Sequence, residues 1–182
     1  MERKPFDQFI IISGSGKKVG KTFMAKALIK RFSSQFPLFA LKISPHHHDS
    51  LGNTKLVTAC EGIRIFQDLV PHYKNSGQFL EAGASSSFFM ETDDKHLENA
   101  FNTFVKICNP QHYPVICESG ALSTLIKPGI LIFIENLTHD LDALKQITLN
   151  RADLVLAAKT FLPAEVLRRI NYNDDRWELI TI

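Results

Sequence analysis

The sequence is poor in cysteine and has no long apolar run. Its three cysteines, Cys60, Cys108 and Cys117, are odd in number and far apart, which supports neither a disulfide framework nor a Cys-x-x-Cys metal knuckle. We expect reduced thiols, with Cys117 in the core. No apolar segment reaches the length of a bilayer-spanning helix, and no apolar region of signal-peptide type follows Met1. These absences predict a cytoplasmic protein that does not act at a membrane.

An excess of charge of one sign is also lacking. The 21 lysines and arginines nearly balance the 19 aspartates and glutamates, giving a formal net charge of +2, and no basic tail is present. Such a balance does not favour binding to nucleic acid or to an anionic membrane. Hydrophobic residues make up 45% of the 182 residues, which is enough for a closed core. We therefore expect one globular domain, residues 1–182.

What the sequence does contain is a glycine-rich segment, residues 13–22, between an apolar run at 9–12 and a helical pattern. Strand, glycine-rich turn and helix in this order are what a phosphate-binding loop (P-loop) requires. Glycines let successive backbone N–H groups approach an anion closely, and the helix N-terminus faces the same anion. The segment predicts contacts to a nucleoside triphosphate from Gly14, Ser15, Gly16, Lys17, Lys18, Val19, Gly20, Lys21 and Thr22.

Two side chains of this segment have distinct predicted roles. Lys21 would reach the β- and γ-phosphates, and the hydroxyl of Thr22 would help to hold Mg²⁺. The usual pattern opens with glycine five positions before Gly20, where this chain has Ser15, and Gly14 stands one place earlier. The alternative interpretation is a simple connecting loop with Lys21 in solvent.

The remainder of the chain alternates between strand and helix patterns. We expect strands at 9–12, 38–43, 63–66, 87–90, 113–117, 130–134 and 154–157, with a last edge strand at 177–182. We expect helices at 21–34, 77–84, 93–105 and 140–149, another opened by Pro163, and a mobile loop at 50–62. This alternation predicts an α/β protein: a three-layer P-loop NTPase fold with a mostly parallel central sheet.

Turnover requires a carboxylate near the metal and a group that positions the nucleophile. Glu118 is the candidate metal ligand, directly or through water, because it ends an apolar strand and is followed by small residues. A solvated glutamate is the alternative. Lys42 and Asp49 flank the run His46-His47-His48, and this group is a candidate for contacts to the γ-phosphate or a second substrate. Asp49 is the next candidate metal ligand, and a solvated loop or metal binding by the histidines also remains open.

Recognition of the base is poorly signalled. Residues 157–161 end a late strand, where many GTPases place an asparagine, a lysine and an aspartate that reads guanine. Here Ala158 and Phe161 stand in the asparagine and aspartate positions. Guanine selectivity by that route is unsupported, so both ATP and GTP remain candidates.

These residues resemble P-loop proteins of the signal-recognition, MinD and BioD superclass. Lys42, the histidine run with Asp49, and the turn Glu81-Ala82-Gly83-Ala84 look like the MobB-type molybdopterin-guanine dinucleotide biosynthesis adaptor, and Glu118-Ser119-Gly120 is similar to the end of a central strand there. The resemblance implies a homodimer that binds GTP or ATP with Mg²⁺, hydrolyses it slowly if at all, and assists nucleotide attachment to molybdopterin, with a molybdenum-cofactor enzyme as a partner. Asn75-Ser76 departs from the acidic residue and serine of that family.

The glycine-rich loop itself is closer to a second family. Gly14-Ser15 followed by Val19-Gly20-Lys21-Thr22 resembles dethiobiotin synthetase and the cobyrinate amidases, in which ATP activates a small carboxylate substrate. This resemblance implies a substrate-side role for Lys42 and a metal-side role for Glu118. A third possibility is a nucleotide-binding switch without catalytic activity.

Overall fold

The central sheet explains most of the strand pattern in the sequence. The computed structural model describes residues 3–45, 53–73 and 76–180 and contains a large α/β sheet with the strand order β3-β4-β5-β2-β6-β1-β7-β8. The strands are β1 (Lys4–Gly14), β2 (Phe39–Ser44), β3 (Thr54–Cys60), β4 (Ile63–Asp68), β5 (Ser86–Thr92), β6 (Val115–Glu118), β7 (Ile126–Glu135) and β8 (Leu154–Ala157). The strands from β5 to β8 in this order are parallel. Strand β4 pairs antiparallel with both of its neighbours, β3 and β5. The expectation of a mostly parallel α/β sheet is confirmed.

Helices pack on both faces of this sheet. The described helices are α1 (Lys21–Phe32), α2 (Gly77–Glu81), α3 (Leu97–Cys108), α4 (Leu122–Leu125), α5 (Ala143–Asn150) and α6 (Pro163–Leu167), with a 3-10 turn at Pro110–His112. One hydrophobic cluster joins Ile10 and Ile12 of β1 to α1, and the other joins Phe9 and Ile11 to α3. Because successive strand residues point to opposite faces, β1 is buried on both sides.

The central position of β1 places its carboxyl end among those of its neighbours. It pairs with β6 on one side and with β7 on the other, so Ile10 lies between Ile116 and Ile130. The chain leaves β1 at Gly14 and enters α1 at Lys21. Parallel sheets bind their ligands at this edge, and Glu118 also ends its strand there.

Four local expectations were wrong. Residues 53–62 contain the edge strand β3, whose mostly exposed side chains leave no clear alternation in the sequence. Strand β7 begins before Pro128, which the sheet tolerates because β8 pairs only from Ile132 onward. The helix expected from Asp93 begins at Leu97, and Asp93 instead accepts a bond from the backbone N–H of His96.

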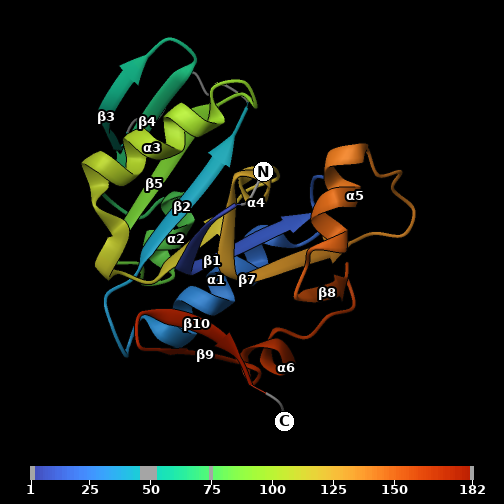
Figure 1. Cartoon of the computed structure of the whole chain (residues 1–182). Coiled ribbons are helices and arrows are strands. Elements are labelled where there is room, and N and C mark those ends of the chain that lie inside the picture. Colours follow the sequence, from blue (N-terminus) through green and yellow to red (C-terminus); the bar gives the residue numbers. More distant parts are fainter. Residues whose placement is uncertain (1–2, 46–52, 74–75, 181–182) are drawn as a thin grey trace.

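The fourth correction concerns the last described strand. Strand β10 (Arg176–Leu179) is not an edge of the main sheet but pairs with β9 (Ile170–Asn173) in a separate hairpin. Figure 1 shows this hairpin in red beneath α1, on the side away from β3 and β4. Its turn uses positive φ angles at Asp174 and Asp175, which aspartate tolerates better than most residues.

Trp177 fastens the hairpin to the rest of the molecule. Its side chain is buried, its indole ring lies 4.9 Å from that of Phe32 and 4.7 Å from that of Tyr172, and its Nε1 donates to Gln8 O at 2.8 Å. Burial also raises the pKa of Tyr172 to about 12, with Asp175 adding to the shift. The hairpin thereby covers the far end of α1.

We expect Trp177→Ala to lower the free energy of unfolding by about 3–5 kcal/mol, because it opens a cavity and leaves Gln8 O without its donor. Urea unfolding followed by far-ultraviolet circular dichroism measures this loss. Trp177→Phe should cost less because it keeps most of the apolar contact. A loss below about 1 kcal/mol for the alanine variant would show that the hairpin is only loosely attached.

Candidate functional site

The glycine-rich loop is held against the end of β7 by close backbone contact. A Cβ on Gly14 would lie 2.6 Å from Ile134 O and 2.9 Å from Val19 Cγ2, so only glycine fits there without a shift. Ser15 N donates to Ile134 O at 3.0 Å. Lys18 and Gly20 have φ angles of 59° and 115°, and Gly20 precedes the first residue of α1. The loop therefore curls so that α1 points its unpaired first-turn N–H groups at the curl.

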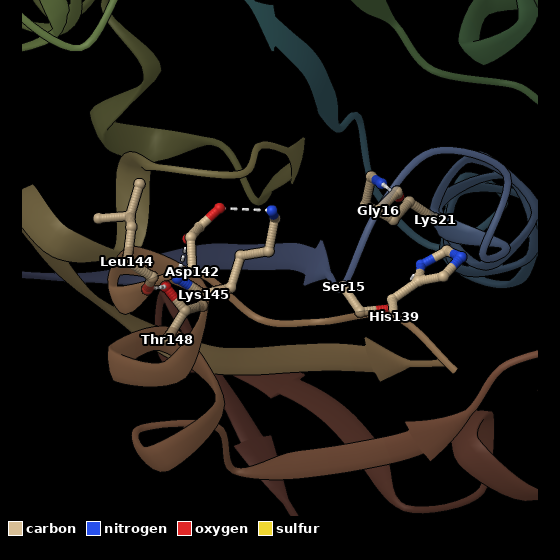
Figure 2. A network of polar contacts seen from close by, with 8 residues as sticks. All are labelled: Ser15, Gly16, Lys21, His139, Asp142, Leu144, Lys145 and Thr148. Atoms are coloured by element: carbon tan, nitrogen blue, oxygen red, sulfur yellow. Dashed lines mark hydrogen bonds and ion pairs between the residues drawn. The ribbon is translucent and has the colours of Figure 1, made fainter. Parts of the chain in front are cut away.

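Ser15 ties this loop to the segment after β7. Its buried Oγ accepts a bond from Asn136 N at 2.9 Å and lies 3.5 Å from His139 Nδ1. Asn136 Nδ2 is 3.1 Å from His139 Nε2, and a Cβ on Gly16 would meet the His139 ring at 2.8 Å. Figure 2 shows the ring beside Ser15. Serine at the position where the usual pattern has glycine thus has a specific structural role.

The ammonium of Lys21 lies across the mouth of the loop. Its Nζ donates to Gly16 O at 2.5 Å (Figure 2). Burial lowers the pKa of Lys21, and the positive charges of Lys42 and Lys145 lower it further, whereas Glu118 raises it. Three cations therefore act on one small region, which would attract an anion carrying several negative charges.

Glu118, at the end of β6, connects the first turn of α1 to β2. Thr22 Oγ1 donates to Glu118 Oε2 at 2.7 Å, and Lys42 Nζ lies 3.2 Å from Glu118 Oε1. The Glu118 side chain is only 9% exposed, so these two donors offset the cost of burying its charge. The structure thus brings together Thr22, Lys42 and Glu118, which are far apart in the sequence.

Two small cavities adjoin the loop. One, of about 180 Å³, is named the phosphate cavity because its cationic and hydroxyl groups would suit a phosphate. Its walls are Lys18, Gly20, Lys21, Thr22, Phe23 and Glu118. The other, of about 160 Å³, lies on the side of α4 and α5 and is lined in part by Gly14, Ser119, Gly120, Asp142 and Lys145. Lys145 Nζ also pairs with Asp142 Oδ2 (Figure 2).

The other predicted residues separate into three groups. Lys17 and Lys18 are exposed on the loop, whereas Val19 is buried. Asp49, the histidine run 46–48 and Asn75 lie outside the described residues. The turn after Glu81 lies along α1, where Lys26 Nζ is 3.4 Å from Glu81 Oε2 and a Cβ on Gly83 would meet Ser33 Oγ at 2.6 Å. Gly83, with a φ angle of 109°, therefore ends α2 for backbone reasons.

Some residues of the site carried no signal in the sequence. Asn136, His139, Asp142 and Lys145 lie more than 100 positions after the loop, in a segment without a motif. Asp142 is recognisable only as the N-cap of α5, where its Oδ1 accepts from Lys145 N at 2.9 Å. Their contribution depends on how β7 and α5 are placed beside β1.

The described residues provide neither a metal centre of clustered ligands nor a reactive thiol at the site. Within residues 3–45, 53–73 and 76–180, no three His, Cys, Asp or Glu side chains gather to form a metal centre. Burial raises the pKa of the Cys117 thiol well above its usual value, and Cys117 lies in the core as expected. Cys117 is therefore not a nucleophile for this site.

Comparison with known proteins identifies no relative. Scans against family models, curated proteins and solved structures each found no match. None of the helices in the described part of the chain is long and apolar enough to cross a bilayer. The candidate site therefore rests on its own geometry.

The lowered pKa of Lys21 predicts that its charge costs stability in the absence of a ligand. Because the pKa in the folded state lies below the ordinary value of 10.5, the cost is fully present below the folded pKa and disappears as pH rises past the unfolded value. We expect Lys21→Met to raise the free energy of unfolding at pH 7 by up to about 1 kcal/mol. Urea unfolding at pH 7 and 10.5 should show this gain shrinking. Lys17→Met, at an exposed position of the same loop, is the control; a less stable Lys21→Met at pH 7 would contradict the argument.

Proposed function

We propose that this chain is a three-layer P-loop NTPase domain that binds ATP or GTP with Mg²⁺ and hydrolyses it slowly. The observation that carries the proposal is the contact between Thr22 Oγ1 and Glu118 Oε2, 2.7 Å, at the mouth of a glycine loop closed by Lys21. The loop, the helix N-terminus and the ammonium supply the three kinds of group that bind a polyphosphate.

The phosphates would displace an interaction that the loop makes with itself. Lys21 Nζ now donates to Gly16 O, and a β- or γ-phosphate oxygen offers it a charged acceptor instead. The backbone N–H groups between Lys18 and Thr22 would converge on the same phosphate. The anion would also compensate the charge of Lys21, whose pKa is lowered first by burial and further by Lys42 and Lys145.

The donor set beside the loop fits Mg²⁺. Thr22 and Glu118 offer two oxygens close together, and Mg²⁺ commonly takes one or two protein oxygens, with phosphate oxygens and waters completing its shell. When bound, the ion would neutralise charge that develops on the phosphates during transfer. Thr22 and Glu118 are the residues that would hold it, with Asp49 as the further candidate from the sequence.

We infer a slow rate of hydrolysis from the contacts that the nearby side chains already make. Among the described residues that line the phosphate cavity, Glu118 alone carries a carboxylate, and it already accepts from Thr22 and pairs with Lys42. A carboxylate engaged in this way is poorly placed to orient an attacking water as well. Lys42 would stabilise charge on the γ-phosphate rather than abstract a proton.

The cavity beside α4 and α5 favours a second candidate function. Its position next to Gly14, with Asp142 and Lys145 in its wall, suits a small molecule that receives the terminal phosphate, as in ATP-dependent activation of a small carboxylate substrate. Release of ADP that depends on an added small carboxylate would support this candidate. Release that needs no second substrate would support the simple NTPase.

The wider role remains a proposal of the same kind. The resemblance to the MobB-type adaptor suggests a homodimer that assists a molybdenum-cofactor enzyme. What supports it in the described residues is the pairing of Lys42 with Glu118 at the phosphate cavity. A protein that binds nucleotide with Mg²⁺ but releases no phosphate under either assay would be a nucleotide-binding switch.

We expect Lys21→Ala to abolish measurable nucleotide binding, because it removes the ammonium at the loop mouth and leaves the phosphate charge uncompensated. Calorimetric titration with ATP and GTP in the presence of Mg²⁺ measures the affinity. Thermal denaturation of the same samples should show that only the wild-type protein is stabilised by nucleotide. Unchanged affinity in the variant would refute the site.

We expect Glu118→Gln to leave nucleotide affinity within about tenfold while removing Mg²⁺-dependent phosphate release, since the amide keeps the size but loses the charge that the metal needs. Phosphate release measured with and without Mg²⁺ tests this. Glu81→Gln, on α2, is the matched control and should retain wild-type release. Retained release in Glu118→Gln would transfer the metal role to another residue, with Asp49 next.

A further inference from the structure

An aromatic pair, Phe23 and Phe161, lies beside the glycine loop, and Phe23 also lines the phosphate cavity. Phe23, in the first turn of α1, is 60% exposed, and its ring lies 6.1 Å from that of Phe161, at 51°. The Phe161 ring contacts the loop itself, because a Cβ on Gly20 would be 3.0 Å from Phe161 Cε1. Leu162, the next residue, is 58% exposed. An apolar surface therefore adjoins the phosphate cavity.

The order of strands places this surface at the nucleoside end of a bound nucleotide. In the sheet, β6 lies on one side of β1, and β7 and β8 lie on the other. Glu118 ends β6, and the metal and terminal phosphates belong on its side, where Lys42 also lies. Phe161 follows β8. A nucleotide whose terminal phosphate faces Glu118 would therefore extend its base toward Phe161.

The turn after β8 positions the backbone of Phe161. Ala158 N donates to Glu135 O at 2.7 Å, and both Thr160 N and Phe161 N donate to Ala157 O, at 3.3 and 3.2 Å. Lys159 takes a left-handed conformation with a φ angle of 68°. These bonds fix the backbone at Phe161, whose ring lies beside Gly20 and Phe23 before any ligand binds.

The composition of the turn determines which base chemistry it can read. Residues 158–162 are Ala-Lys-Thr-Phe-Leu and contain no carboxylate to accept hydrogen bonds from the guanine edge. An aromatic face stacks on any base, because every base has a π-face, and such stacking is tolerant of base identity.

We propose that Phe161, supported by Phe23, is the base-binding platform of this protein, and that it accepts adenine and guanine nucleotides alike by stacking rather than by hydrogen bonding. The inference rests on the proposed function, since it places the base by assuming that the phosphates occupy the glycine loop. On this inference, binding of both ATP and GTP is a property of the site itself.

The experiment compares nucleotides with the bare phosphate chain. Calorimetry with Mg²⁺ gives the affinities of the full chain for ATP, GTP and inorganic tripolyphosphate, in the wild type and in Phe161→Leu, which keeps apolar bulk but loses the aromatic face. We expect the wild type to bind ATP and GTP within about threefold of each other, and Phe161→Leu to bind both about tenfold more weakly. Tripolyphosphate affinity should not change. Phe66→Leu is the matched control, because Phe66 lies in β4, near the opposite edge of the sheet from β8. Its affinities should equal those of the wild type.

The possible outcomes separate this inference from the function beneath it. If tripolyphosphate and nucleotides bind but Phe161→Leu changes none of the affinities, or weakens tripolyphosphate equally, the platform is wrong and the phosphate site stands. A preference of a hundredfold or more for one base would also overturn it. If none of the three ligands binds to the wild type, the proposed function and the platform fail together.

Discussion

The buried carboxylate of Glu118 is the constraint on which the arrangement of the site depends. A charge this far from solvent must be compensated, and its two partners come from different elements, Thr22 from α1 and Lys42 from β2. Both can reach it only because β6 lies between β1 and β2 in the sheet. The strand order thus brings both partners to one side chain, and a different pairing of these strands would separate Glu118 from them.

The loop next to Glu118 combines a rigid frame with an unfavourable charge. Gly14 and Ser15 are fastened to β7 and to the segment after it, so the backbone donors are arranged before a ligand arrives. The ammonium of Lys21, by contrast, is desolvated and close to other cations. A rigid cradle with a poorly compensated cation binds anions well, because little entropy is lost and repulsion is relieved. The same cation lowers the stability of the unliganded fold.

The sequence predicted those features that are local. The strand, glycine turn and helix around residues 9–34 carry their own signals, and the end of an apolar strand indicated Glu118. The strand β3 was missed because an exposed edge shows little alternation, and the hairpin β9–β10 because short strands resemble turns. The contact of Ser15 with His139 spans 124 positions and follows from the placement of β7 beside β1. Long-range packing of this kind leaves no pattern along a single chain.

The chain has a single tryptophan, and its position gives the molecule a built-in optical reporter. Trp177 packs edge-to-face against Phe32, the last residue of the helix whose first residue is Lys21. A shift or rotation of that helix would alter the polarity and quenching around the indole, about three turns from the loop. Emission from this one ring therefore senses motion at the opposite end of a rigid rod, without any added dye.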